Sequence, residues 1–141
     1  MSVRNLLRHD ALFFEEYVEK PFTFRASSSS TTFTIIVRFY RIDDLVTIKI
    51  EKSDAFSSPS GVYYYYTSDE KIDDIFLPRN YQTIQKSIPI RTRVATNSYN
   101  PGNMFITTDK RLRLHAGYNG NFGSSTTTQL PSPTYASYLG I

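Results

Sequence analysis

The stretch FTIIVRFYRIDDLVTIKI, residues 33–50, decides the fold. Residues 33–40 and 45–50 are rich in β-branched and aromatic residues, which favour strands. Residues 41–44 are predicted to join them, with two Asp residues, Asp43 and Asp44, that favour turns. In the second half apolar residues alternate with Thr47 and Lys49, so one face is expected to be buried and the other exposed. The first half carries apolar residues on both faces and is expected to be the more central strand. The stretch therefore predicts an antiparallel hairpin.

The chain that follows this hairpin is also typical of short strands separated by turns. Residues 87–95 alternate apolar and basic side chains, and Pro89 within them lacks a backbone N–H, which predicts either an edge strand or a strand that begins at Ile90. A second hairpin is predicted with its turn at Asp109-Lys110. The other predicted elements are a strand at residues 61–66, a short element at 72–78, a turn at 97–103 and a closing strand at 135–139. Roughly eight strands predict an all-β fold, specifically a two-sheet antiparallel β-sandwich or jelly roll.

Residues 1–21 are predicted to form a short N-terminal helical attachment segment ahead of a β jelly-roll domain at residues 22–141. Apolar residues recur there at three- and four-residue spacing, and Pro21 ends the pattern. Two interpretations remain open, a helix packed on its own domain and a segment that docks on another protein or on copies of itself. The side chains assigned to attachment are Leu6, Leu7, Phe13, Phe14 and Tyr17.

Composition narrows the function classes. A chain of 141 residues corresponds to about one domain. It has no Cys, which excludes disulfides, thiolate metal ligands and Cys nucleophiles. A general base needs an orienting carboxylate, and neither His9 nor His115 has one at a suitable spacing. We therefore expect no enzyme activity, no catalytic residue, no metal site and no cofactor.

Charge and hydropathy bear on partners and location. The net charge of +3 permits contact with nucleic acid or acidic glycans without implying it. Nucleic-acid binding is not expected, because the tyrosines lie apart from the arginines. The N-terminus lacks the apolar core and cleavage site of a signal peptide, and no apolar run is long enough to span a membrane, so no membrane insertion is expected.

Four arginines form a candidate basic patch. They alternate with apolar residues in two predicted strands, so they would share one face if both strands lie in one sheet. Such a patch could contact phosphate, acidic sugars or carboxylates of a neighbouring subunit. The alternative is a solvated outer face whose charges discourage edge pairing. The residues are Arg91, Arg93, Arg111 and Arg113.

Tyrosines form the candidate interface between subunits or with a partner protein. In a strand, two of four consecutive tyrosines face each side, so one pair can enter the core while the other pair is stacked, paired or at an interface. Tyrosine offers a large contact area at low entropic cost, which suits recognition surfaces. Plain packing and sugar stacking remain alternatives for the run. The residues are Tyr63, Tyr64, Tyr65 and Tyr66, with Tyr135 and Tyr138 of the closing strand.

Four stretches carry a family resemblance: residues 38–48, 77–81, 106–114 and 135–139. In order and pattern they resemble the head or knob domains of phage and large-virus fibres, which share the trimeric jelly-roll plan of the C1q/TNF-like heads. In that family a threonine-aspartate-glycine turn precedes a strand. Here Lys110 stands where the glycine would be, so a different turn type or a longer loop is expected. The resemblance covers about residues 33–141.

The resemblance implies a function as well as a fold. It implies a homotrimer with the closing strand as an inner strand near the threefold axis. It also implies a structural protein of the virion, at the capsid surface or in a fibre knob, assembled in the host cytoplasm. Its partners would be other virion proteins and, in host attachment, a cell-surface receptor or glycan. The alternative function is a carbohydrate-binding or adhesion head of the C1q-like type.

Overall fold

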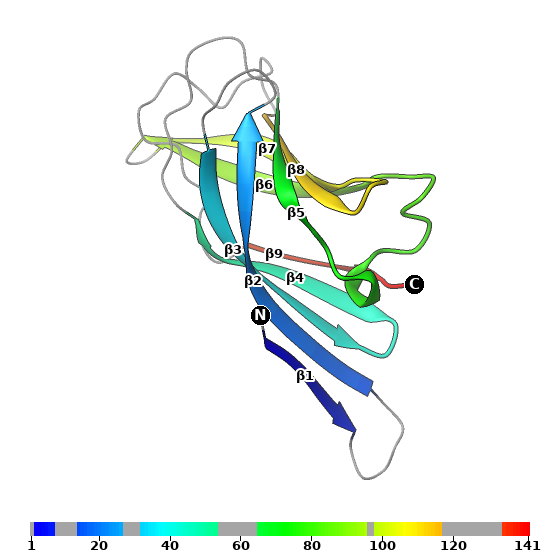
Figure 1. Cartoon of the computed structure of the whole chain (residues 1–141). Helices are drawn as coiled ribbons and strands as arrows, with labels where there is room; N and C mark the ends of the chain where they lie inside the picture. Colours follow the sequence, from blue (N-terminus) through cyan, green and yellow to red (C-terminus); the bar gives the residue numbers. More distant parts are fainter. Residues whose placement is uncertain (1, 8–13, 27–31, 54–64, 96–97, 117–133) are drawn as a thin grey trace.

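The computed structural model describes residues 2–7, 14–26, 32–53, 65–95, 98–116 and 134–141 (Figure 1). In these residues the secondary structure consists of strands and one short 3-10 helix, η1 (Asp74–Phe76). The predicted all-β class is therefore confirmed. The strands are β1 (Ser2–Leu7), β2 (Phe14–Ala26), β3 (Thr32–Ile42), β4 (Leu45–Ser53), β5 (Tyr65–Lys71), β6 (Lys86–Ala95), β7 (Ser98–Ile106), β8 (Arg111–Ala116) and β9 (Thr134–Leu139).

The strands form one antiparallel sheet in the order β6-β7-β8-β5-β2-β3-β4-β9, with β1 paired to β2. One edge of β2 pairs with β3 along most of its length, and the other edge is shared by β1 at the start and β5 at the end. Figure 1 shows β4 and β9 below the β6–β8 strands, with the end of β2 rising beside β5. The predicted two-sheet sandwich or jelly roll is not confirmed, because a single hydrogen-bonded sheet links both groups.

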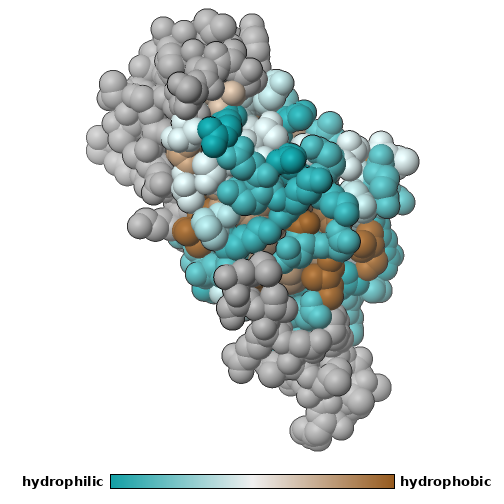
Figure 2. Space-filling model, in the orientation of Figure 1, coloured by the Kyte–Doolittle hydropathy of each residue, from teal (hydrophilic) through white to brown (hydrophobic). Residues whose placement is uncertain are grey.

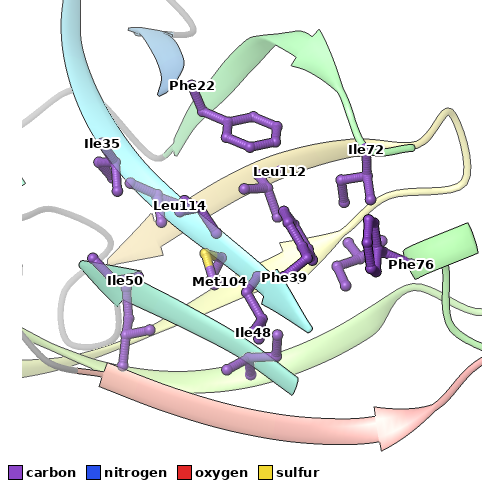
Figure 3. Close-up of a cluster of buried hydrophobic side chains, with 14 of the residues drawn as sticks. Phe22, Ile35, Phe39, Ile48, Ile50, Ile72, Phe76, Met104, Leu112 and Leu114 are labelled. Atoms are coloured by element: carbon purple, nitrogen blue, oxygen red, sulfur yellow. The ribbon is translucent and has the colours of Figure 1, made fainter. Parts of the chain in front are cut away.

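The hydrophobic core is built from the inward positions of both groups of strands. In β3 burial alternates residue by residue, as a strand with one covered face requires. Figure 3 shows Phe39 and Ile48 of the β3–β4 hairpin in one cluster with Met104 and Leu114 of β7 and β8. Phe39 also stacks on Phe76 of η1, with ring centroids 5.5 Å apart. The two ends of the sheet thus share one core.

Both predicted hairpins are confirmed. Ile42 of β3 pairs directly with Leu45 of β4, so the turn consists of two residues, and Arg41 and Ile42 of the predicted four-residue connection belong to β3. Its first residue, Asp43, has a φ of 50°, a left-handed conformation that Asp tolerates better than most residues. The second hairpin joins β7 to β8. The strand that contains Pro89 lies at the end of the sheet, as predicted.

The predicted turn at residues 97–103 is wrong, because residues 98–103 belong to β7. The Asn, Pro and Gly residues that favour a turn are placed in a strand by their neighbours. Pro101 pairs with the edge strand β6, and Gly102 pairs with β8. A Cβ on Gly102 would lie 2.8 Å from the backbone oxygen of His115, so the close approach of β8 requires glycine there.

The predicted N-terminal helix is also wrong, because Ser2–Leu7 and Phe14–Ala26 are strands. The four-residue spacing of Val18 and Phe22 suits a helix and equally suits one face of a strand, and both side chains are buried in the core. Pairing with β3 decides between the two. The expected boundary between residues 21 and 22 falls inside β2.

The attachment role predicted for this segment loses its helical basis. Leu6 and Leu7 lie in β1, and Phe14 begins β2. Phe13 lies outside the described residues. Tyr17 is a half-buried residue of β2, opposite Tyr40 of β3.

A buried arginine holds the C-terminus against the hairpin and η1. Arg41 is only 8% exposed. Its Nε donates to the Asp43 carbonyl at 2.6 Å, Nη1 to the Ile75 carbonyl at 2.8 Å and Nη2 to the Ile141 carbonyl at 2.7 Å. Gly140 passes so close that an added Cβ would lie 2.8 Å from Nη1. One guanidinium therefore joins three segments that are far apart in the sequence.

The closing strand β9 is confirmed as a strand, but it is not an inner strand. Among the described strands it pairs with β4 alone and ends the sheet. Tyr138 anchors it, since the side chain is buried and its hydroxyl donates to the Phe76 carbonyl at 2.6 Å. Burial raises the pKa of this tyrosine well above its usual range.

Replacing Arg41 by leucine should lower the free energy of unfolding by about 3 kcal/mol, because three carbonyls lose a charged donor in a buried place. The measurement is equilibrium denaturation in urea. The control is Arg25→Leu, which removes an exposed ion pair with Asp69 and should cost about 0–1 kcal/mol. Equal losses for the two variants would contradict the role of Arg41.

The turn between β7 and β8 yields a second test. Lys110 has a φ of 71° and donates its backbone N–H to the Thr107 carbonyl at 3.1 Å, so it occupies a conformation that glycine adopts without strain. Lys110→Val should lower the melting temperature by roughly 5 °C, because a β-branched residue is strained there. Lys110→Gly is the matched control, because both variants lose the ion pair between Lys110 and Asp74 at 2.8 Å, and it should melt at a higher temperature than Lys110→Val. A less stable glycine variant would contradict this reading of the turn.

Candidate functional site

The outward face of β2, β3, β4 and β9 carries three rows of side chains that run across the strands. The rows follow from the register, since directly paired residues point to the same face. The first, called the apolar row, contains Ile42, Leu45 and Leu139, with Glu15 at its β2 end. The second, the tyrosine row, contains Tyr17, Tyr40, Thr47 and Ser137. The third, the ion-pair row, contains Glu19, Arg38, Lys49 and Tyr135.

A groove of about 340 Å³ lies over the tyrosine and ion-pair rows. The predicted separation of Thr47 and Lys49 from the buried face of the hairpin is confirmed, since both line this groove. The full lining is Tyr17, Arg38, Tyr40, Thr47, Lys49 and Tyr135.

Charges in the ion-pair row are balanced by nearby carboxylates. Arg38 lies 3.0 Å from Glu19 and 3.0 Å from Glu51, and Lys49 lies 2.9 Å from Glu51. The hydrogen bonds from Arg38 and then from Tyr17 hold the pKa of Glu19 below its usual value. The hydrogen bond to Glu51 raises the pKa of Lys49. Glu19 therefore stays ionised and Lys49 stays protonated near neutral pH.

Aromatic rings and hydroxyls complete the groove. The Arg38 guanidinium lies 5.1 Å from the ring centroid of Tyr17, and Lys49 Nζ lies 5.2 Å from that of Tyr135, both within cation–π range. The hydroxyls of Thr47 and Ser137 are 2.9 Å apart. Tyr135 is 60% exposed. The groove thus suits a polar ligand that also has an apolar face.

A second outward surface lies on β5, β8 and β7. Tyr65 stacks on His115 with ring centroids 5.5 Å apart, and Phe105 meets the same imidazole edge-on at 4.9 Å. The Arg113 guanidinium lies 4.8 Å from the Tyr65 ring centroid. Burial, followed by the charge of Arg113, lowers the pKa of His115. These four side chains form a half-buried aromatic row.

Arg111, predicted for the basic patch, completes an irregular part of the β5–β8 pairing. The register between these strands shifts within β5. Arg111 Nη1 donates to the carbonyls of Ser68 and Asp69, and its Nε lies 3.2 Å from the Asp109 carboxylate. The guanidinium therefore supplies donors to the sheet and is neutralised locally.

The other predicted arginines are spread along the sheet. Arg113 pairs with Phe105, which pairs with Ser87 of β6. Arg91 is exposed and lies four residues further along β6, about 13 Å away. Arg93 also lies in β6, and its side chain is outside what the structure describes. The described arginines thus do not gather into one cluster.

The predicted tyrosines have three different positions. Tyr63 and Tyr64 lie outside the described residues. Tyr65 belongs to the aromatic row, whereas Tyr66 is fully buried and meets Phe33 edge-on at 5.0 Å between ring centroids. The interface role predicted for Tyr66 and Tyr138 gives way to packing, because neither side chain reaches the surface. Tyr135 lies in the groove.

The groove therefore combines two residues singled out from the sequence, Tyr17 and Tyr135, with others that sequence reasoning missed. The apolar spacing of the N-terminal segment predicts a helix that contains Tyr17, so the pairing of Tyr17 with Tyr40 of β3 could not be predicted from it. Arg38 could have been found from the sequence, because it alternates with apolar residues in the predicted hairpin. The outward positions of the two strands share one face, which places Arg38 on the same face as Thr47 and Lys49.

Two absences concern the described residues alone. No helix in them is long and apolar enough to cross a membrane. They also contain no group of three or more His, Cys, Asp or Glu side chains placed to hold a metal ion.

Comparisons with known proteins place the fold. No family model matches the sequence, and no curated protein matches it. Among solved structures, the chain is similar to the reovirus attachment protein sigma1, whose crystal structure is in complex with alpha-2,3-sialyllactose. The TM-score is 0.59 at 11% sequence identity, and the match covers 91% of this chain and 66% of the sigma1 chain. This chain thus spans about two thirds of the sigma1 chain.

This similarity shows that the chain shares its fold with the sigma1 structure, and it does not single out the C1q/TNF type. At such low identity it concerns the fold alone.

The aromatic row predicts a pH dependence of stability. The pKa of His115 is below its ordinary value of 6.5 in the folded chain, so the unfolded chain binds the proton more readily. The contribution of neutral His115 to the free energy of unfolding should be fully present above about pH 6.5. It should be lost as the pH falls from there toward the folded pKa. Thermal melts from about pH 7.5 to about pH 5 measure it. His115→Gln should flatten this dependence.

The comparison variant is His9→Gln, which replaces the other histidine of the sequence. If His9→Gln flattens the profile and His115→Gln does not, the assignment to His115 is wrong.

Proposed function

We propose that this chain is a non-enzymatic module of a virion surface, acting in attachment through contacts with copies of itself and with other virion proteins. The attachment-like fold supports the location and role. A homotrimer is the assembly we propose, as the resemblance to fibre heads implies. The module would act at the capsid surface or in a fibre.

The observation that carries this proposal is the apolar row at the end of the sheet. Leu45 and Leu139 are 49% and 53% exposed, and Ile42 and Ile141 are exposed beside them. Figure 2 has hydrophobic residues at the surface in the region where Figure 1 places the C-terminus and the β3–β4 turn. Exposed apolar side chains that gather in one place favour a protein interface.

The edge strand adds to this surface. β9 ends the sheet among the described strands, and its outward residue Leu139 belongs to the apolar row. The Arg79 backbone N–H already donates to the Leu139 carbonyl at 2.9 Å, so among the described strands the edge of β9 open to a partner is the part that precedes Leu139. That part offers backbone hydrogen bonds, and the apolar row offers buried area. We propose a second copy of the chain as that partner.

A second candidate function is adhesion to a cell-surface glycan, which the groove favours. The solved sigma1 structure holds alpha-2,3-sialyllactose, which makes a glycan a reasonable ligand class to test here. Tyrosines, hydroxyls and charged groups in one groove match the chemistry of sugars. Glycan adhesion and self-association use different rows, so both functions can coexist.

Replacing Leu139 by aspartate should convert the oligomer to a monomer, because a charge would be buried in the contact. Multi-angle light scattering at micromolar concentration should give about three times the chain mass of 16.2 kDa for the unchanged protein. The Leu139→Asp variant should give the mass of one chain.

The matched control is Ile84→Asp, at an isoleucine that is 66% exposed between η1 and β6 and is not a member of the apolar row. This variant should remain oligomeric. A monomeric unchanged protein would sink the proposed self-association, and equal effects of both variants would show that the apolar row is not the contact.

A further inference from the structure

The groove has the size of a small-ligand site. Its volume of about 340 Å³ is near the lower end of the roughly 300–1,000 Å³ usual for such sites. The strands that bound it, β2 and β9, are three interstrand steps apart, which is about 14 Å. One or two sugar rings match these dimensions.

The charges of the groove decide what kind of ligand it favours. Its two cations, Arg38 and Lys49, already face two carboxylates, Glu19 and Glu51. Glu51 lies between both cations, at 3.0 Å from Arg38 and 2.9 Å from Lys49. A ligand carboxylate would have to displace one of these pairs and would bring a third negative charge to two positive ones. Acidic ligands are therefore disfavoured.

The same groups suit a neutral polyol. Carboxylates accept hydrogen bonds from sugar hydroxyls, and the guanidinium and ammonium groups donate to them. Tyr135, more than half exposed, presents a ring against which the C–H face of a pyranose can pack. Thr47 adds a hydroxyl to the lining of the groove. The groove thus offers hydrogen-bonding groups for the hydroxyls of a neutral hexose and an aromatic ring for its C–H face.

We propose that this groove binds a neutral hexose ring and discriminates against sugars that carry a carboxylate. The inference deepens the glycan adhesion named under the proposed function and rests on it. It does not depend on the oligomeric state, because the apolar row lies apart from the ion-pair row. Leu45 and Lys49 are four residues apart in β4, about 13 Å.

The test uses matched sugars and the full chain. Methyl glycosides of glucose and galactose are compared with those of glucuronic and galacturonic acid, which differ only by the carboxylate. Binding is measured by saturation-transfer NMR and by chemical-shift titration. At least one neutral sugar should bind with a Kd on the order of 1 mM, and its acidic counterpart should bind about tenfold more weakly.

Two variants locate the site. Tyr135→Ala should weaken the neutral sugar about three- to tenfold, through loss of the ring contact. Glu51→Gln should strengthen the acidic sugar about tenfold, because both cations lose their shared carboxylate. Tyr65→Ala, at a half-buried tyrosine on the other outward surface, is the control and should leave binding unchanged. Thermal melts confirm that each variant is folded.

Three results would contradict the proposed binding of a neutral hexose. No binding by either neutral sugar at tens of millimolar, or acidic sugars binding as well as neutral ones, would overturn the proposal. A loss of binding in Tyr65→Ala equal to that in Tyr135→Ala would place the site elsewhere and would overturn it too. A monomer that still binds neutral sugar would refute self-association and leave this inference intact, whereas an oligomer that binds no sugar would do the reverse.

Discussion

The buried guanidinium of Arg41 is the interaction on which the outward face depends. A buried cation is costly unless its donors are satisfied, and here carbonyls of the β3–β4 turn, η1 and the C-terminus satisfy them. These three segments must therefore meet. Their meeting holds the end of β9 against β4, which places Tyr135 in the groove and Leu139 in the apolar row. The hydrogen bonds of Arg41 thus help to position both the buried and the outward side chains of β9.

The strand register turns this closure into a surface with a defined chemistry. Successive side chains of β3 and β4 alternate between the core and the outward face, so the runs that bury Phe39 and Ile48 also present Arg38 and Lys49. A slip of one residue would exchange the two sets. Burial of the apolar residues therefore fixes the register, and the register keeps Arg38 and Lys49 on the outward face. The ion-pair row and the apolar row lie on either side of the tyrosine row, so the face has one part suited to a sugar and another suited to a protein.

Much of the fold was open to prediction because its signals are local. The β3–β4 hairpin follows from alternation and an aspartate turn, and the edge position of β6 follows from the missing N–H of Pro89. The N-terminal helix failed for a physical reason. A spacing of four residues between Val18 and Phe22 fits both a helix and a strand, and only the pairing of β2 with β3 selects the strand. The run at residues 98–103 failed because contacts with β6 and β8 override turn propensity.

The sequence by itself determined the all-β class, both hairpins and the residues that face outward in them, because these depend on side-chain periodicity and on neighbours within a few positions. Only the tertiary structure decided that Tyr17, from the N-terminal segment, and Tyr135, from the closing strand, share a groove with Arg38 and Lys49. It also decided that Tyr66 and Arg111 serve packing and backbone pairing. Strand order and register are set by contacts between distant segments, and no local pattern specifies which strands become neighbours.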